Sequence, residues 1–132
     1  VAAGQGAWRR SVKKQTTYAS GPDSRWRIAE AARIRNAVGP EIRELARDID
    51  AGVDRGRAWM PQLAAAKNAA TEATLRAVEQ AMRACGGSAY YNTHELSRLS
   101  RDAPAGLFQP SDQESLHAAW ANLILGPIEK AH

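Results

Sequence analysis

The sequence predicts an all-α protein, an antiparallel four-helix bundle with one additional short helix. Apolar residues recur at steps of three and four over long segments, which is the period of an amphipathic helix. Glycine and proline pairs separate these segments, and no stretch alternates with the period of two that a strand requires. A length of 132 residues is that of one domain, so we expect a single bundle over residues 1–132.

The first two helices are expected at residues 2–19 and 25–51. The intervening Ser-Gly-Pro-Asp-Ser contains a proline, which cannot continue the first helix. Gly21 suits a left-handed cap at the end of the first helix, and Asp23 or Ser24 can cap the start of the second.

The second helix is expected to be interrupted at Gly39 and Pro40. Proline offers no N–H to the helix and its ring clashes with the preceding turn, so we expect a kink or two separate helices. A rough apolar stripe on this segment contains Trp26, Leu45 and Ile49, and we expect these side chains to face the core.

The third helix, at residues 58–84, is the clearest of the set. Its apolar stripe consists of Trp59, Leu63, Ala66, Ala70, Ala73 and Ala77. So much alanine on one face predicts a close approach of the neighbouring helices, and about 1.5 Å per residue gives a length of about 40 Å. Gly86 and Gly87 follow the helix and are expected to end it.

The C-terminal third is expected to contain a loop at residues 88–94 and then a helix that starts near Glu95. A last helix is expected to run toward Leu125, where a Gly-Pro pair breaks it. Ser111 or Asp112 is expected to cap this last helix, because short polar side chains accept hydrogen bonds from the first free N–H groups of a helix.

Composition limits the possible partners. The net charge is +4, and the basic residues near the N-terminus permit a nucleic-acid contact, but acidic residues follow and favour a solvated helix face. We therefore expect no nucleic acid. No apolar run approaches the ~20 residues that span a bilayer, so we expect no membrane. Cys85 is the single cysteine, which fits a reducing, cytoplasmic setting.

The residues alone indicate no catalytic or metal centre. The three histidines lie far apart in the sequence without the spacing of metal ligands, so we expect no metal. No serine lies in a Gly-x-Ser-x-Gly context. The carboxylates near the turns are explained by helix capping as well as by catalysis. The second glycine at Gly87 is the sharper signal, because one glycine is enough for a cap and two let a phosphate or another chain approach the backbone.

The stretch Gly-Gly-Ser-Ala-Tyr-Tyr-Asn-Thr-His-Glu-Leu-Ser-Arg-Leu-Ser-Arg-Asp resembles the C-terminal helical domain of acyl-CoA dehydrogenases. In that family a long helix ends in Gly-Gly, and a helix with an Arg-x-x-Arg-Asp motif follows a loop. Gly86, Gly87, Arg98, Arg101 and Asp102 stand at the matching positions without a gap. The helices before the glycines also look like those of the family, and the resemblance covers nearly the whole chain.

The resemblance implies a role in a larger flavoprotein, of which this chain would be a piece. FAD lies between subunits in that family, and the Gly-Gly turn touches its ADP half, so the implied cofactor contacts are Arg83, Gly86 and Gly87. Arg101 and Asp102 would fix the helix that follows the turn. The implied partners are further copies in a dimer or tetramer, or a related subunit, and an acyl-CoA or similar small substrate.

Three departures bear on what the resemblance implies. Arg83 stands where the family usually has a glutamine, three residues before the first glycine. Ser-Gly-Pro-Asp-Ser replaces an Arg-Phe-Gly motif that contacts FAD in the family. Pro110 occupies the position of the usual catalytic glutamate, and proline cannot remove a proton. We therefore expect no catalytic residue and no activity of this chain alone. A dehydrogenase, a flavin-dependent monooxygenase of the divergent branch and a non-catalytic assembly subunit remain as alternatives.

Overall fold

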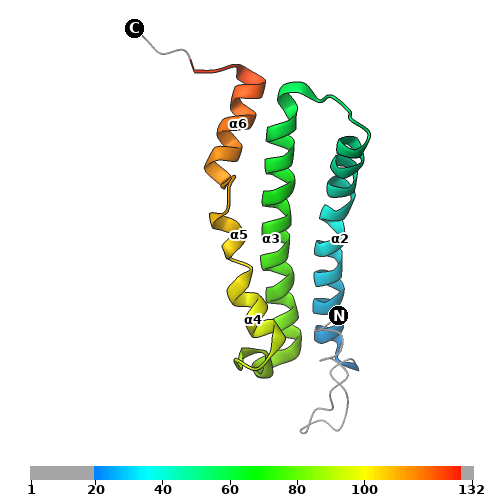
Figure 1. The fold of residues 1–132 in the computed structure, drawn as a ribbon. Coiled ribbons are helices and arrows are strands. Elements are labelled where there is room, and N and C mark those ends of the chain that lie inside the picture. The colour runs from blue at the N-terminus through cyan, green and yellow to red at the C-terminus, as the bar shows by residue number, and fades with distance from the viewer. Residues whose placement is uncertain (1–19, 129–132) are drawn as a thin grey trace.

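The computed structural model describes residues 20–128, which form helices and turns without a strand (Figure 1). The elements in chain order are α2 (Pro22–Asp50), η2 (Gly56–Ala58), α3 (Trp59–Cys85), η3 (Gly86–Tyr90), α4 (Glu95–Asp102), α5 (Ala105–Phe108) and α6 (Gln113–Leu125). The predicted all-α class is confirmed. The helix expected at residues 2–19 lies outside the described residues.

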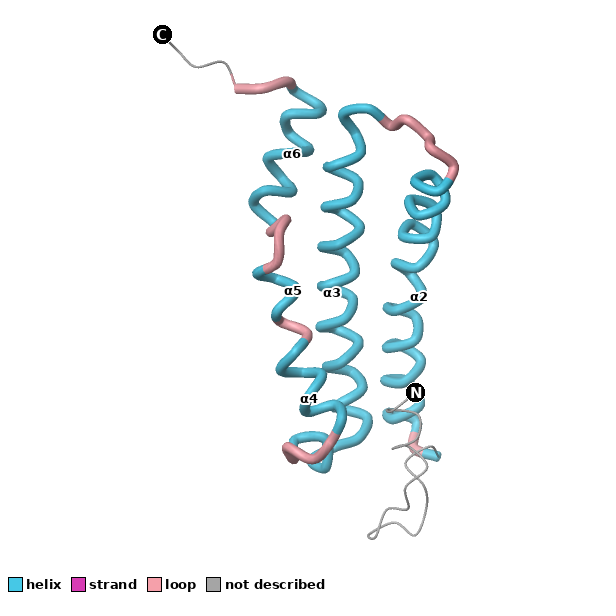
Figure 2. The backbone as a smooth tube through the Cα atoms, in the orientation of Figure 1, coloured by secondary structure: helices cyan, strands magenta, loops and turns pink. Residues whose placement is uncertain are grey.

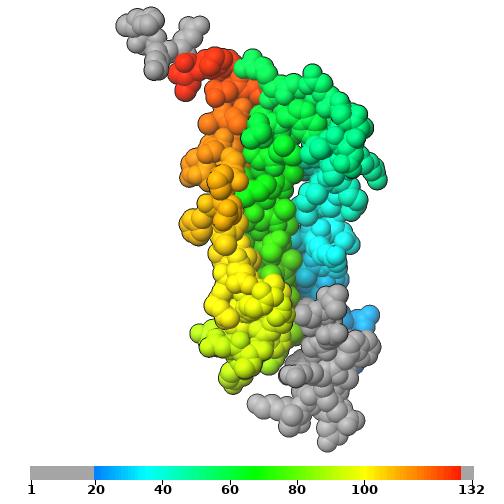
Figure 3. Space-filling model, in the orientation of Figure 1, coloured from blue at the N-terminus to red at the C-terminus, as the bar shows by residue number. Residues whose placement is uncertain are grey.

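The described helices form three columns side by side, with α3 in the middle (Figures 1 and 2). α2 runs antiparallel to α3 on one side. On the other side α4, α5 and α6 follow one another end to end and form the third column. The space-filling view shows α3 between the other two columns along most of its length (Figure 3). α3 therefore provides the packing surface for every other helix.

The start of α2 differs from the prediction. Gly21 has an extended backbone, with φ −78° and ψ 128°, and is itself the N-cap, so its expected left-handed conformation is wrong. Pro22 occupies the first helical position, where a missing N–H costs nothing. Asp23 lies in the first turn and provides no side-chain cap, but its charge favours the N-terminal end of the helix dipole.

Of the two alternatives expected at Gly39 and Pro40, two separate helices is wrong, because α2 continues as one helix through both residues, with Pro40 inside it. Figure 2 shows the second half of α2 turned relative to the first half, so the helix bends along its length. A proline inside a helix removes one backbone hydrogen bond but leaves the turns on either side intact. The packing of α2 along α3 on both sides of Pro40 outweighs that loss.

The face of α3 that contacts the other helices is made of small residues. Its buried side chains are Pro61, Ala64, Ala66, Ala73, Ala81, Ala84 and Cys85. Two members of the predicted stripe, Ala66 and Ala73, are among them, whereas Leu63 is exposed. Near the C-terminal end, Ala81 and Cys85 pack with Ala89 and Leu96 in one apolar cluster. The helices thus approach closely, as expected, and alanine methyl groups make most of the contacts between them.

The predicted core of α2 is only partly correct. Leu45 is buried as expected, but Trp26 is 60% exposed and Ile49 is also exposed. Ile34, which lies outside the expected stripe, is the other buried residue of α2. Within the described residues α2 packs mainly against α3, so much of its surface is left uncovered. The indole of Trp26 instead lies beside the guanidinium of Arg27, 6.0 Å from its ring centroid.

A polar cluster closes the turn between α2 and α3. Arg55 donates from Nε and Nη2 to the same oxygen of Asp48, Oδ2. It also donates to Oε1 of Gln62 at 2.7 Å and to Oε1 of Glu44 at 3.2 Å. Its guanidinium also lies 5.5 Å from the ring centroid of Trp59. One side chain from the turn therefore ties the end of α2 to the start of α3.

Lys67 anchors the third column to α3. Its ammonium donates to the backbone oxygens of Gly106 at 2.6 Å, Gln109 at 2.8 Å and Ser111 at 3.0 Å. The side-chain amide of Asn68 donates to the same oxygen of Ser111 at 3.0 Å. These bonds fix the linker between α5 and α6 on the surface of α3.

Side chains cap the helices of the third column. The expected loop at residues 88–94 is wrong in its first half, because η3 extends to Tyr90. His94 then caps α4, with its Nδ1 accepting a hydrogen bond from the backbone N–H of Leu96 at 3.1 Å. Of the two expected caps of α6, the structure uses Asp112.

Asp112 accepts a hydrogen bond from the backbone N–H of Ser115 at 2.8 Å. Hydrogen bonding with Ser115, through its side chain first and its backbone N–H second, holds the pKa of the Asp112 carboxyl below its usual value. The ionised carboxylate therefore favours the folded cap at neutral pH, and this contribution is lost as the pH falls through the lowered pKa.

We expect Gly106→Ala to lower the melting temperature of the protein. A Cβ at this position would lie 2.8 Å from both Cγ2 and Oγ1 of Thr71, so α5 would have to move away from α3. Overpacking of this kind costs roughly 1–3 kcal/mol. Thr71→Ala in the same protein removes the two closest atoms and should restore part of the loss. Thermal unfolding measures both variants, and equal melting temperatures of Gly106→Ala and wild type would contradict the packing.

We expect Lys67→Met to loosen the linker between α5 and α6. The substitution keeps an apolar stem but removes the charged donor of the Gly106 and Gln109 oxygens and leaves the Ser111 oxygen with Asn68 alone. A hydrogen bond with a charged group contributes about 1.5–3 kcal/mol, and less where the groups are exposed, as here. Hydrogen exchange at the amides of residues 106–115 should become faster. Arg76→Met, an exposed change on the same helix, is the matched control. Unchanged exchange in the Lys67 variant would show that the linker holds its position without these bonds.

Candidate functional site

The Gly-Gly turn lies at one end of the described bundle, where α3 ends, η3 follows and α4 begins (Figure 1). Gly86 has φ +66° and ψ −157°, a conformation that residues with a Cβ rarely adopt, and it is the C-cap of α3. The predicted end of the third helix at the double glycine is confirmed. The first glycine is thus explained by the backbone of this chain.

The second glycine has no such explanation. Gly87 is exposed, and its φ lies outside the left-handed region that favours glycine. A Cβ built at this position meets no atom of the chain within 4 Å. Neither backbone conformation nor packing within the described residues requires a glycine there, so the open space beside Gly87 is available to a group from outside the chain.

Arg83 lies in the last turn of α3, three residues before Gly86, and its side chain is exposed. Its guanidinium donates to Oε1 of Glu79 at 2.5 Å, one turn back along the helix. A cation in this turn also complements the negative end of the helix dipole. The three predicted cofactor residues, Arg83, Gly86 and Gly87, therefore share one end of α3, although the arginine is paired along the helix.

Two exposed aromatic residues complete this end of the bundle. Tyr90 and Tyr91 follow the glycines and show most of their surface to solvent, while Ala89 between them and the glycines is buried. From the sequence, both tyrosines are expected only as part of a loop. A tyrosine pair directly after a glycine turn was the signal, because exposed aromatic rings next to an accessible backbone form a surface that can contact a flat ligand.

The Arg-x-x-Arg-Asp motif acts within its own helix. Arg98 forms a bidentate ion pair with Glu95, in which Nε and Nη2 of the arginine donate to the two carboxylate oxygens. Its Nη1 donates to Oδ2 of Asp102 at 2.8 Å, which makes a second ion pair. The hydrogen bond from Arg98 lowers the pKa of Glu95, so the pair favours the folded state at neutral pH and is lost as the pH falls through that pKa. These bonds hold α4 as a regular helix.

Arg101 joins α4 to the turn before it. Its Nη1 donates to Oγ of Ser97 at 2.8 Å and to Oδ1 of Asn92 at 3.4 Å. Ser97 is buried, so this contact reaches the inner side of the helix. The expected role of Arg101 in fixing the helix after the turn agrees with these contacts.

Pro110 lies in the linker between α5 and α6, part of the way along the third column and away from the Gly-Gly turn (Figure 1). It is exposed, and its neighbours Gln109 and Ser111 both accept hydrogen bonds from Lys67. The role of Lys67 was missed by sequence reasoning. The signal was one lysine among alanines on an otherwise apolar helix face.

The described residues at this end of the bundle offer contact surfaces. A proline at position 110 has no titratable group, so this position supplies no base. In the part of the chain that the structure describes, no three His, Cys, Asp or Glu side chains gather in a way that could hold a metal ion. Among the same residues, no helix is both long enough and apolar enough to cross a membrane. What this end of the bundle offers chemically is an open backbone, a cation and two aromatic rings.

Comparison with known proteins gives one family. The family model described as the acyl-CoA dehydrogenase, C-terminal domain, matches residues 3–108, which is well over half of the chain. No curated protein matches the sequence. The match contains the α3 helix, the Gly-Gly turn and the Arg-x-x-Arg-Asp motif, and it ends before Pro110. The chain therefore belongs to the acyl-CoA dehydrogenase family, of which it contains the C-terminal helical domain.

Proposed function

We propose that residues 1–132 are one domain of a longer FAD-dependent oxidoreductase and that this domain contributes to FAD binding across a subunit interface. The observation that carries the proposal is Gly87, a glycine that neither the backbone nor the packing of the described chain requires. A phosphate can approach the backbone closely only where no side chain shields it, as at a solvent-exposed glycine. Membership of the acyl-CoA dehydrogenase family provides the flavin context.

The charges at this end of the bundle support an anionic group. The C-terminal end of α3 carries the negative end of the helix dipole, which by itself disfavours phosphate. Arg83 places a cation in the same turn, and its exposed guanidinium can exchange Glu79 for a phosphate oxygen. Peptide N–H groups at the glycines would add charge-assisted hydrogen bonds. When bound, FAD supplies the acceptor of a hydride.

The activity that fits this chain is an oxidation in which the catalytic base is a residue other than residue 110. If the parent protein oxidises an acyl thioester, a carboxylate outside position 110 has to remove the α-proton, because Pro110 has none. A flavin-dependent monooxygenase of the same architecture is the second candidate. It is favoured by the same observation, since its chemistry needs no α-proton base at this position.

The third column supports a role in oligomer assembly. No Lys, Arg, Asp or Glu occurs between Ser115 and Ile128, and α6 has no buried residue. Ile124 is 72% exposed and Leu125 is 83% exposed. A helix that is apolar on its outer as well as its inner face belongs inside a larger assembly. We propose that a further copy of the protein, in a dimer or tetramer, covers this face, and that a related subunit is the alternative partner.

We expect Gly87→Ala to weaken FAD binding in the full-length protein without lowering the stability of the apo-protein. The added methyl group fits the chain itself but would hold a pyrophosphate away from the backbone. A lost hydrogen bond to a charged group is worth roughly 1.5–3 kcal/mol, or about ten- to a hundredfold in affinity. FAD titration of the apo-protein and thermal unfolding without flavin measure the two effects.

Gly86→Ala is the matched control for this experiment. Gly86 has a positive φ, so alanine there should be strained by about 1–2 kcal/mol and should lower the apo melting temperature. Gly87→Ala should instead leave that temperature unchanged or raise it slightly. Equal FAD affinity of the wild type and Gly87→Ala would remove the support for the flavin contact.

We expect Ile124→Glu to reduce the oligomeric mass of the full-length protein. The substitution places a charge on the exposed apolar surface near the C-terminal end of α6, where contact with another copy would have to desolvate it. Asn122→Glu introduces the same charge on the same helix at a polar position and is the control. Size-exclusion chromatography with light scattering measures the mass, and no difference between the two variants would exclude this face from the interface.

A further inference from the structure

The start of α4 depends on a hydrogen bond that only one charge state of histidine can make. Nδ1 of His94 accepts a hydrogen bond from the backbone N–H of Leu96 at 3.1 Å. An imidazole nitrogen accepts a hydrogen bond only while it carries no proton, so the neutral ring has its proton on Nε2. When the ring gains a second proton, Nδ1 becomes a donor that faces another donor, and the cap is lost.

Histidine differs from the usual capping residues in the pH at which its charge changes. Serine, threonine and asparagine do not titrate and aspartate titrates near pH 4, whereas histidine gains its proton between about pH 5 and pH 8. An imidazolium at the N-terminus of a helix also lies at the positive end of the helix dipole. The stabilisation from this cap is therefore present at the upper end of that range and is lost as the pH falls through it.

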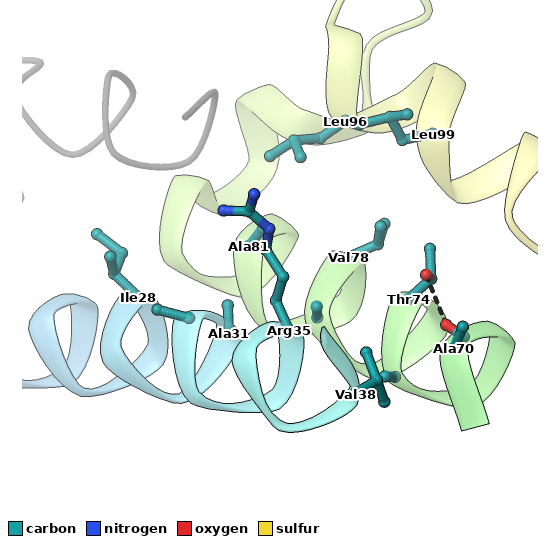
Figure 4. Close-up of a pocket in the computed structure, with 13 residues that line it drawn as sticks. Ile28, Ala31, Arg35, Val38, Ala70, Thr74, Val78, Ala81, Leu96 and Leu99 are labelled. Atoms are coloured by element: carbon teal, nitrogen blue, oxygen red, sulfur yellow. Dashed lines mark hydrogen bonds between the residues drawn. The ribbon is translucent and has the colours of Figure 1, made fainter. Parts of the chain in front are cut away.

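The cap lies where α4 packs on the end of α3. α4 has eight residues, too few to be stable as an isolated helix. The N–H that His94 binds belongs to Leu96, whose side chain is buried in the apolar cluster at the end of α3. Figure 4 shows Leu96 and Leu99 on the side of α4 that faces α3, where both line a pocket of about 500 Å³. Loosening the first turn of α4 would therefore open this pocket and expose the cluster.

The other ionisable groups around His94 keep their charge over this range. The carboxylates of Glu95 and Asp102 would favour an imidazolium, but both are paired with Arg98. The hydrogen bond from Arg98 lowers the pKa of Glu95, so Glu95 stays ionised while a histidine titrates. The remaining ionisable side chains of α4, of the turn before it and of the adjoining end of α3 are Arg101, Tyr90, Tyr91, Cys85, Arg83 and Glu79. Side chains of these types ordinarily titrate below about pH 5 or above about pH 8.

We propose that His94 is a pH switch built into the fold, in which the neutral ring holds the start of α4 against the apolar cluster and the protonated ring releases it. The released segment consists of the turn at residues 91–94 and the first turn of α4. This segment directly follows Gly86 and Gly87, so the switch acts on the same end of the bundle as the proposed flavin contact. It does not depend on that contact, because the cap and the cluster belong to this chain alone.

Hydrogen exchange in the full-length protein without flavin tests the switch. The wild type, His94→Asn and His94→Ala are compared at about pH 7.5 and about pH 5.5, on either side of the usual titration of histidine, in peptides that cover residues 95–100. Asparagine is a good cap that does not titrate, so His94→Asn should match the wild type at the higher pH. At the lower pH the wild type should exchange about two- to thirtyfold faster than His94→Asn, which is the factor that the loss of a cap gives. His94→Ala should exchange fast at both pH values.

His117→Asn is the matched control. His117 is an exposed histidine on α6, so this substitution removes a titrating ring outside the turn and should leave the response of the wild type unchanged. The proposal is overturned if the wild type and His94→Asn exchange alike at both pH values, or if His117→Asn removes the response. Protection of His94→Ala equal to that of the wild type at the higher pH would overturn it as well, because α4 would then not need the cap.

A dye that binds exposed apolar surface gives a second measurement on the same proteins. Its fluorescence should rise in the wild type between the higher and the lower pH, because the release of α4 exposes the apolar cluster. His94→Asn should show no such rise. Both measurements are made without flavin, so they are independent of the FAD affinity of Gly87→Ala. An equal rise in the wild type and His94→Asn would show that another group causes the opening and would overturn the role of His94.

Discussion

The close contact between the alanine face of α3 and its neighbours is the constraint on which the rest of the structure depends. Every other described helix packs on α3, yet no large side chain is fully buried in this part of the chain. Each alanine buries little apolar area. Because its side chain is small, the helix backbones come close together and make many van der Waals contacts. Sites such as Gly106 against Thr71 show how little space remains.

The same constraint explains why the third column depends on polar anchors. α4 and α5 contain eight and four residues, far fewer than an isolated helix needs in water. Their position therefore depends on specific bonds to α3 and on caps. Lys67 holds the linker between α5 and α6, His94 begins α4 and Asp112 begins α6. Directional bonds compensate for the small apolar area.

Sequence patterns predicted the elements whose boundaries are set locally. The end of α3 and the start of α4 were correct, because a glycine cap is a property of a few adjacent residues. Trp26 was expected in the core and is exposed, because periodicity shows which side chains share a face but not whether another helix covers it. The double glycine was visible in the sequence, whereas the difference between Gly86 and Gly87 required φ angles and the neighbouring atoms.

At the α5–α6 linker, the bonds that hold the backbone in place do not involve the side chain at residue 110. Lys67 bonds to backbone oxygens of Gln109 and Ser111, on either side of Pro110, and not to any side chain there. A linker held through its carbonyl groups keeps its position whatever side chain stands at residue 110. The fold can therefore present a carboxylate at this point in one protein and a proline in another without a change in its supports. On the correspondence that the sequence resemblance implies for Pro110, this chain keeps the supports of the position but has no acid–base group there. One fold can serve different functions in this way.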